Sequence, residues 1–435
     1  MASKTLASPL IRHVATRGFA AAAPSSKAHG DLQTATIGGS IPATAMDSGS
    51  PITRVTLAFK AGSRYEHPTE LGLSHVLRSA AGLSTQKISS FMINRKMAQI
   101  GATLSSSGDR EFVYYTVEAT QDHIDSALQY LGELVSCQEF RPWELSDNTP
   151  RLKYDVAAIS PQVRAVDLLH KAAYRRGLGN SLYISPKRIG SISTESLLHF
   201  ANTNVTQSKC SIGIYGSLEK AHVLAANLNL PKGGSEAQPS NYHGGELRKE
   251  MGGELAHVTL ALPGAPAGTP ESLALALFAK ALGNGPVTKW GADNSMLAKA
   301  IGNIGPFAAA GFNVSYSDGG LVGVVLSVPK DEANKAVKAV ANLLKAPKLD
   351  AAAFKAGANQ LKMQIYSEAE YGTTLTENLA AQTLYGGAKD PAALAQAIDS
   401  LNPSIVEKAL SHASKAKMSM GAAGNLAYVP YLDEL

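Results

Sequence analysis

The chain has 435 residues, of which 45% are hydrophobic and 17% are charged. A chain of this length and composition corresponds to roughly two to four globular domains and can bury substantial cores, which excludes a disordered protein. Cysteine occurs only at Cys137 and Cys210, so a disulfide scaffold and a cysteine-built zinc or iron–sulfur site are excluded as well. No apolar run reaches the roughly 18–20 residues that a membrane-spanning helix needs.

The positive charge of the chain is concentrated at its start. The net charge is +5, and residues 1–30 contain four basic residues and no Asp or Glu. Removing those four leaves 36 basic and 35 acidic residues, so the rest of the chain is nearly neutral and carries no nucleic-acid footprint. Within this segment, Leu6, Leu10 and Val14 recur every four residues and would line one face of a helix. Such a basic amphipathic segment is typical of a mitochondrial transit peptide, which we expect at residues 1–19.

The sequence repeats itself once, at long range. Residues 109–135 and 318–344 both begin with alternating apolar residues, as in a β-strand, and continue with apolar residues at helical spacing. The first helical positions, Ile124 and Ala333, are separated by 209 residues. Solenoid repeats have periods of roughly 20–50 residues, so this much longer period indicates a duplicated domain.

We therefore predict two homologous domains, residues 36–228 and 252–429, joined by a linker at 229–251. The linker stretch is rich in Gly, Pro, Ser and charged residues, which is typical of exposed connections. Each half ends in an apolar strand, at 210–216 and 418–424, and strands and helices do not alternate strictly. This order predicts an α+β fold in which each domain has a mostly antiparallel sheet packed with helices.

One segment resembles a known active site. Residues 60–80 read KAGSRYEHPTELGLSHVLRSA, which is similar to the opening of the inverted-zincin (pitrilysin-type) metallopeptidases. These enzymes carry His-x-x-Glu-His on a helix, where two His four residues apart bind zinc from one helical face. The Glu acts as general base on the zinc-bound water, and a Glu on a later helix completes the ligand set of the family. The resemblance therefore identifies the positions in this sequence where zinc ligands and a general base would be expected.

The residues at these positions do not preserve the site. His75 occupies the first His position, but Arg78 stands where the family has its general base and Ser79 where it has the second His. A guanidinium cannot accept a proton near neutral pH, and a hydroxymethyl group is a poor substitute for imidazole. No Glu occurs from 145 to 194, so Asp155 is the one plausible carboxylate on the expected downstream helix.

The second half offers no replacement. Its equivalent helix, at 272–283, carries Ala276 at the position of His75, so neither half assembles the zinc site. We therefore expect no catalytic residue, no bound metal and no cofactor. We interpret Cys137 and Cys210 as buried free thiols.

Longer stretches resemble one branch of this family. Residues 139–155, 172–193, 281–302 and 312–323 are similar to the core 2 subunits of mitochondrial ubiquinol–cytochrome c reductase (respiratory complex III), and the resemblance covers about residues 36–425. Core 2 subunits have the same duplicated peptidase fold and lack an intact zinc motif. The resemblance implies a non-catalytic structural subunit that supports assembly and stability of the complex in respiratory electron transport.

The same resemblance implies a location and partners. The chain would lie peripherally on the matrix side of the mitochondrial inner membrane. Its partners would be a homologous core 1 subunit and membrane subunits such as cytochrome b and cytochrome c1, and it would bind no haem, quinone or iron–sulfur cluster itself.

Two other functions stay open at this point. A presequence-binding, non-catalytic subunit of the mitochondrial processing peptidase shares the fold and also lacks the base. That subunit has a longer Gly-rich loop than the segment at 283–291, which we interpret as a helix-to-strand connection. An active metallopeptidase using His75 and Asp155 with an unusual third ligand ranks last, because it would lack the general base.

Overall fold

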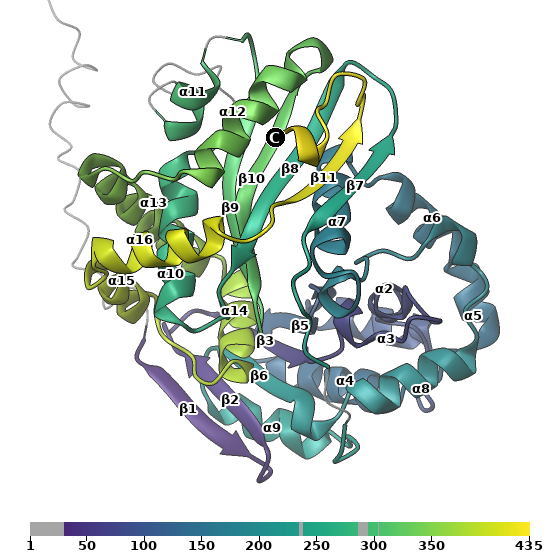
Figure 1. Ribbon diagram of the computed structural model, residues 1–435. Coiled ribbons are helices and arrows are strands. Elements are labelled where there is room, and N and C mark those ends of the chain that lie inside the picture. Colours follow the sequence, from purple (N-terminus) through teal and green to yellow (C-terminus); the bar gives the residue numbers. More distant parts are fainter. Residues whose placement is uncertain (1–29, 235–237, 286–294, 303) are drawn as a thin grey trace, which may run out of the picture.

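The computed structural model describes residues 30–234, 238–285, 295–302 and 304–435. Each half of the chain forms one β-sheet that packs with helices, and the two halves lie next to each other (Figure 1). The predicted α+β class is therefore confirmed. The expected transit peptide, residues 1–19, lies outside the described residues. None of the helices in the described ranges is long and apolar enough to cross a membrane.

The sheet of the N-terminal half has six strands. They are β1 (Leu32–Ile37), β2 (Ile41–Met46), β3 (Ile52–Phe59), β4 (Thr103–Gly108), β5 (Val113–Thr120) and β6 (Cys210–Tyr215). Their order across the sheet is β1-β2-β6-β3-β5-β4, and all neighbours are antiparallel except β2 and β6, which run parallel. The expectation of a mostly antiparallel sheet is thus confirmed for this half.

Helices of the same half pack on this sheet and around it. They are α2 (Leu73–Ser79), α3 (Ser90–Gln99), α4 (Ile124–Ser136), α5 (Pro142–Asp147), α6 (Thr149–Ala157), α7 (Pro161–Tyr174), α8 (Thr194–Asn204) and α9 (Glu219–Asn227). In α4, the predicted positions Ile124, Leu128, Leu131 and Val135 are all buried in the core of this half.

The C-terminal half repeats this plan with five strands. They are β7 (Gly245–Glu250), β8 (Leu255–Gly264), β9 (Ala308–Ser315), β10 (Gly320–Pro329) and β11 (Ser419–Gly424), in the order β7-β11-β8-β10-β9. Only β7 and β11 run parallel. The helices are α10 (Pro270–Leu282), α11 (Met296–Ile301), α12 (Ala333–Lys345), α13 (Ala351–Glu370), α14 (Gly372–Leu384), α15 (Pro391–Asp399) and α16 (Pro403–Ser414).

The duplication is visible in the element bounds. Helix α4 covers Ile124–Ser136 and α12 covers Ala333–Lys345, a shift of 209 residues at both ends. The last strands of the two halves, Cys210–Tyr215 and Ser419–Gly424, differ by the same 209 residues. The internal sequence repeat therefore corresponds to two copies of one structural unit, a β-sheet with its packed helices.

One strand lies inside the stretch that we expected to be a linker. Strand β7, within 229–251, pairs in parallel with β11, as β2 pairs with β6. Its sequence, GELRKE, is charged because β7 is an edge strand whose side chains are partly or fully exposed. The exposed, charged sequence of β7 therefore has the composition of a linker. The duplication nevertheless predicts a strand here, because the second half needs a counterpart of β2.

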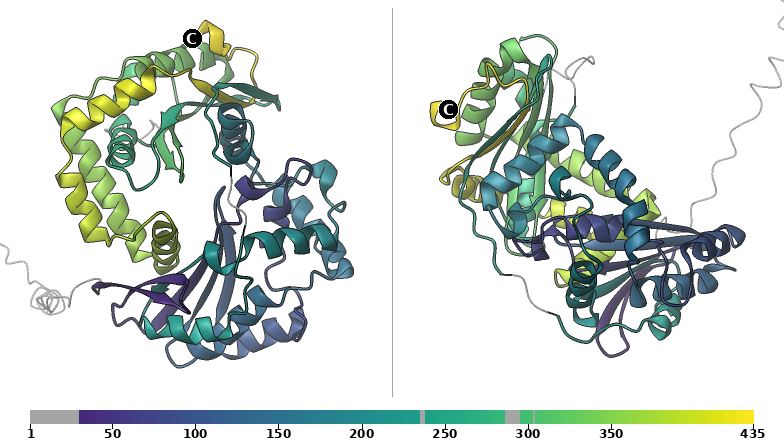
Figure 2. Two further views of the ribbon diagram at one scale, coloured as in Figure 1. Left: turned by 60° about the horizontal axis from the view of Figure 1, so that its bottom comes forward. Right: turned by 90° about the vertical axis from the view of Figure 1, so that its right-hand side faces the viewer.

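One helix of each half packs on the β-sheet of the other half (Figure 2). Helix α7 of the first half packs on β7, β8 and β11, and α14 of the second half packs on β2, β3 and β6. Glycines make these crossings possible: a Cβ at Gly213 would lie 2.1 Å from the carbonyl oxygen of Thr376, and one at Gly421 would lie 2.2 Å from that of Ala165. The two halves are thus interlocked rather than merely adjacent.

Candidate functional site: the former zinc helix

Helix α2 carries the positions of the former zinc motif and begins at a buried carboxylate. Glu66 is 5% exposed, and its carboxylate accepts hydrogen bonds from the backbone amides of Gly72 (2.8 Å) and Ser74 (2.7 Å). Amides at the start of a helix have no partner within the helix, so this carboxylate satisfies them. Burial raises the pKa of Glu66 to about 7. Glu66 therefore fixes where the helix starts.

His75 lies in this pocket with one ring nitrogen already engaged. Its Nδ1 accepts a hydrogen bond from the backbone amide of Ile184 at 3.3 Å. A neutral imidazole has one acceptor nitrogen, so this bond leaves the ring proton on Nε2. Nε2 lies 4.0 Å from Oδ2 of Asp155. Burial, and then the charge of Arg78, lower the pKa of His75 to about 4, so the ring is neutral at pH 7. A metal at the nitrogen near Asp155 would therefore have to displace this proton.

Arg78 fills the general-base position with a largely buried cation. Its guanidinium donates hydrogen bonds to the carbonyl oxygens of Leu182 (2.8 Å), Ser74 (3.3 Å) and Gly108 (3.4 Å). Gly108 makes room for it, because a Cβ there would lie 2.8 Å from Cδ of Arg78. Burial lowers the pKa of Arg78. A guanidinium in this place cannot take a proton from water, and its charge repels a divalent cation.

Ser79, at the second His position, is tied into the helix. Its hydroxyl donates to the carbonyl oxygen of Val76 (3.0 Å) and accepts from Nδ2 of Asn148 (2.9 Å). The guanidinium of Arg151 adds a long hydrogen bond to the carbonyl oxygen of Ser79 (3.4 Å). Hydrogen bonds from Asn148 and Arg151 therefore occupy the position that the second zinc-binding His has in the peptidases.

The structure brings His75 and Asp155 together but adds no further ligand to them. A zinc ion in a protein needs three or four ligands at about 2.0–2.3 Å. Within the described ranges, no group of three or more His, Cys, Asp or Glu side chains is placed to hold a metal ion. The arrangement can orient and stabilise α2, but it lacks the groups that would bind zinc and activate water.

The corresponding helix of the second half is apolar. Helix α10 lies against β9 and α16, as α2 lies against β4 and α8. Leu275, Leu277 and Phe278 of α10 are at most 2% exposed, and Ala276, at the position of His75, packs beside Leu277. A hydrocarbon surface in this place offers no ligand for a metal.

A second buried polar cluster joins the two halves. Glu111 is 1% exposed and accepts hydrogen bonds from Arg64 (2.6 Å), from the Tyr385 hydroxyl (2.6 Å) and from the backbone amide of Ser317 (2.9 Å). Arg64 also forms a salt bridge with Asp318. Arg64 and Glu111 belong to the first half, and the other three belong to the second, so the network fixes the halves relative to each other.

The sequence alone did not reveal this network, nor the role of Glu66. A signal existed: residues 109–111 read Asp-Arg-Glu immediately before the buried strand β5, and charged residues beside a core strand need partners. Cys137 is half-buried and Cys210 is buried, and both are free, so the expectation of a buried thiol holds for Cys210 only. The Gly-rich segment at 283–291 lies mostly outside the described residues.

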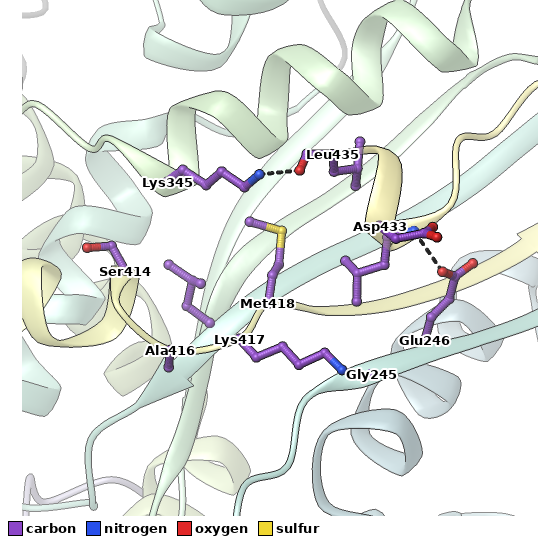
Figure 3. A pocket seen from close by; sticks show the side chains of 11 residues that line it. Gly245, Glu246, Lys345, Ser414, Ala416, Lys417, Met418, Asp433 and Leu435 are labelled. Atoms are coloured by element: carbon purple, nitrogen blue, oxygen red, sulfur yellow. Dashed lines mark hydrogen bonds between the residues drawn. The ribbon is translucent and has the colours of Figure 1, made fainter.

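A pocket of about 540 Å³ in the C-terminal half is bordered by the end of the chain itself (Figure 3). Lys345 donates a hydrogen bond to the carbonyl oxygen of Leu435, and Glu246 accepts one from the backbone amide of Leu432 (2.8 Å). Ser414, Lys417 and Met418 also line the pocket. These contacts hold residues 432–435 against α12 and β7.

Comparisons with known proteins agree with this geometry. Residues 43–185 match the family "Insulinase (Peptidase family M16)", and residues 191–361 match "Peptidase M16 inactive domain". The fold and the degraded motif thus define a chain of the M16 peptidase class without the zinc-binding constellation.

Similar proteins of known name show to which branch of the M16 family the chain belongs. The human "Cytochrome b-c1 complex subunit 2, mitochondrial" is 34% identical over 93% of this chain and 92% of its own length. The potato "Mitochondrial-processing peptidase subunit alpha" is 24% identical over 92% of this chain and 83% of its own length. A solved chain described as "Complex III2 from Candida albicans, Inz-5 bound" has the same fold, with a TM-score of 0.77, 17% identity and coverage of 93% and 98% of the two chains. The chain belongs to the family of cytochrome b-c1 complex subunit 2.

Proposed function

We propose that this chain is a non-catalytic structural subunit of mitochondrial ubiquinol–cytochrome c reductase, respiratory complex III. The observation that carries the proposal is the guanidinium of Arg78 in the general-base position, held by the carbonyl oxygens of Leu182 and Gly108. A chain of this size that has kept the M16 fold and lost its zinc chemistry acts through its surface. The similarity to b-c1 subunit 2 over 93% of the chain supports the choice of complex.

The proposal extends to specific partners and a location. The chain pairs with a homologous core 1 subunit and contacts membrane subunits such as cytochrome b and cytochrome c1. It lies peripherally on the matrix side of the inner membrane, where a transit peptide at residues 1–19 would deliver it. Its contribution to electron transport is assembly and stability of the complex, since it supplies no redox group.

Native electrophoresis of mitochondria tests this function. Blue-native gels probed for this chain are expected to show it in a large inner-membrane assembly together with cytochrome b and cytochrome c1. Deleting the chain is expected to reduce the amount of assembled cytochrome b. Normal assembly of cytochrome b in the deletion strain would contradict a structural role.

A second candidate is the presequence-binding subunit of the mitochondrial processing peptidase. It is favoured by the likeness to the potato subunit alpha, although the identity is 24% rather than 34%. The same gels separate the two functions, because this candidate predicts migration with a soluble matrix peptidase. A matched gel probed for cytochrome b serves as the marker for complex III.

A further inference from the structure

An open cavity of about 810 Å³ lies between the segment that precedes α2 and the end of α7, and His75, Arg78 and Ser79 are not among its lining residues. Tyr65, Glu66 and His67 line it on one side, and Tyr174, Arg175 and Arg176 line it on another. The segment Gln238–His243, which leads from the first half to the second, closes the third side. A cavity of this size matches those that bind small molecules, which span about 300–1,000 Å³.

The cavity is rich in uncommitted positive charge. The guanidinium groups of Arg175 and Arg176 are exposed, and neither forms a hydrogen bond or salt bridge with a residue in the described ranges. The one carboxylate of the lining, Glu66, is turned away to the amides at the start of α2. The cavity therefore favours an anion.

The backbone at Arg175 is strained. This residue has φ of 63° and ψ of −45°, a conformation that a residue with a Cβ rarely adopts and that costs about 1–3 kcal/mol. Glycine would satisfy the same backbone without strain. The chain therefore holds a long cationic side chain beside the cavity where a glycine would be more stable.

We propose that this cavity binds a phosphate-bearing ligand through Arg175 and Arg176. A guanidinium donates parallel hydrogen bonds to two phosphate oxygens, and two free guanidinium groups match the two or more negative charges of a phosphate group. Tyr65 is partly exposed in the same lining and offers ring surface for the rest of the ligand. The inference does not depend on the complex to which the chain belongs.

Calorimetric titration of the full chain with pyrophosphate, at constant ionic strength, tests the proposal. The wild type is expected to bind pyrophosphate, and the double variant Arg175→Gln/Arg176→Gln is expected to bind at least about tenfold more weakly. The control Arg95→Gln removes an exposed arginine on α3 and is expected to leave binding unchanged. No binding by the wild type, or equal binding by the double variant, would overturn the proposal.

A further variant separates ligand binding from a structural role. Basic residues after a helix also complement the helix dipole, so a purely structural role would change stability only. Arg175→Gly is expected to raise the midpoint of thermal unfolding while weakening pyrophosphate binding. A stabilised Arg175→Gly variant with unchanged binding would contradict the assignment of Arg175.

The source of the phosphate is resolved by flotation with phosphatidylcholine vesicles with and without cardiolipin. Binding of pyrophosphate without flotation identifies a soluble phosphate compound. Cardiolipin-dependent flotation that pyrophosphate reverses identifies a lipid headgroup. Flotation that persists in the double variant, without pyrophosphate binding, would contradict the site.

Discussion

The chain buries charged side chains in two places, and their physical situations differ. Between the halves, burial acts to lower the pKa of Arg64, but the hydrogen bonds and charges of Asp318 and Glu111 outweigh it and raise that pKa. On α2, the hydrogen-bond partners of Arg78 within the described part of the chain are carbonyl oxygens, and burial lowers both its pKa and that of His75. The ion-paired Arg64 links the two halves, whereas Arg78 is held by local carbonyl oxygens within the first half.

The two regions also differ in which parts of the chain their contacts connect. The network around Glu111 uses residues from both halves, so it can act only in the folded, interlocked molecule. The α2 pocket uses local contacts that close the place of a metal. We expect mutations in the network to affect folding of the whole chain, and those in the pocket to have smaller, local effects.

The largest expected effect is that of Glu111→Gln. It removes one carboxylate from the buried network and leaves Asp318 as the remaining ion-pair partner of Arg64. Because Asp318 still compensates the charge, we expect a loss of about 3 kcal/mol in the free energy of unfolding, the lower end of the range for breaking a buried pair. Urea denaturation measures it. The control is Glu118→Gln, whose partner Arg54 lies in a partly exposed pair and whose loss should cost less than about 1 kcal/mol. Equal losses in both variants would contradict a special role for the network.

A second effect concerns pH. The folded chain protonates His75 only near pH 4, whereas the unfolded chain does so near its usual pKa of about 6.5. The unfolded state therefore binds more protons between these values, and this residue makes stability fall as the pH drops from about 6.5 to 4, by up to about 3 kcal/mol. His75→Gln is expected to flatten this part of the profile, measured by urea denaturation at several pH values.

The matched control for the pH profile is His199→Gln, because His199 is exposed on α8. It is expected to keep the slope of the wild type. If His75→Gln and the wild type lost stability in parallel over this range, the buried neutral imidazole would be refuted.

The smallest expected effect is that of Ser79→Ala. The variant removes the hydroxyl that accepts from Asn148, while the carbonyl oxygen of Ser79 remains within 3.3 Å of the same amide. We expect a loss of about 1 kcal/mol in thermal or urea denaturation. Ser411→Ala is the control, since its hydroxyl makes a similar bond to the carbonyl oxygen of Lys408 on the exposed face of α16. A loss as large as that of Glu111→Gln would contradict the ranking of the two regions.

Much of the architecture could be predicted because it depends on local periodicity and on duplication. Apolar spacing located α4 and α12, and the shift of 209 residues related them correctly. The composition of 229–251 predicts a linker although β7 lies within it, because an edge strand tolerates a charged sequence such as GELRKE. The exchange of α7 and α14 between the sheets was not predicted, since no local pattern says on which sheet a helix will pack.

The residues of the candidate site could be predicted where the motif positions lie close together in the sequence. Their hydrogen-bond partners could not be predicted where these are distant in the sequence. His75, Arg78 and Ser79 lie within one helix and follow from alignment of the motif alone. The amide of Ile184 that sets the tautomer of His75 is 109 residues away in sequence. Tyr385, which donates to Glu111, is 274 residues away. Long-range hydrogen bonds of this kind leave no periodic trace in a sequence.

The zinc content of the purified full chain, measured by mass spectrometry of the metal after equilibration with zinc, tests the central claim most directly. The variant Arg78→Glu/Ser79→His, which restores the motif beside His75 and Asp155, serves as the control and is expected to take up zinc. For the wild type, a guanidinium in place of the base and a serine in place of the second His predict far less than one zinc per chain and no peptide cleavage. One zinc per wild-type chain, lost in His75→Ala and accompanied by chelator-sensitive peptide cleavage, would contradict the account.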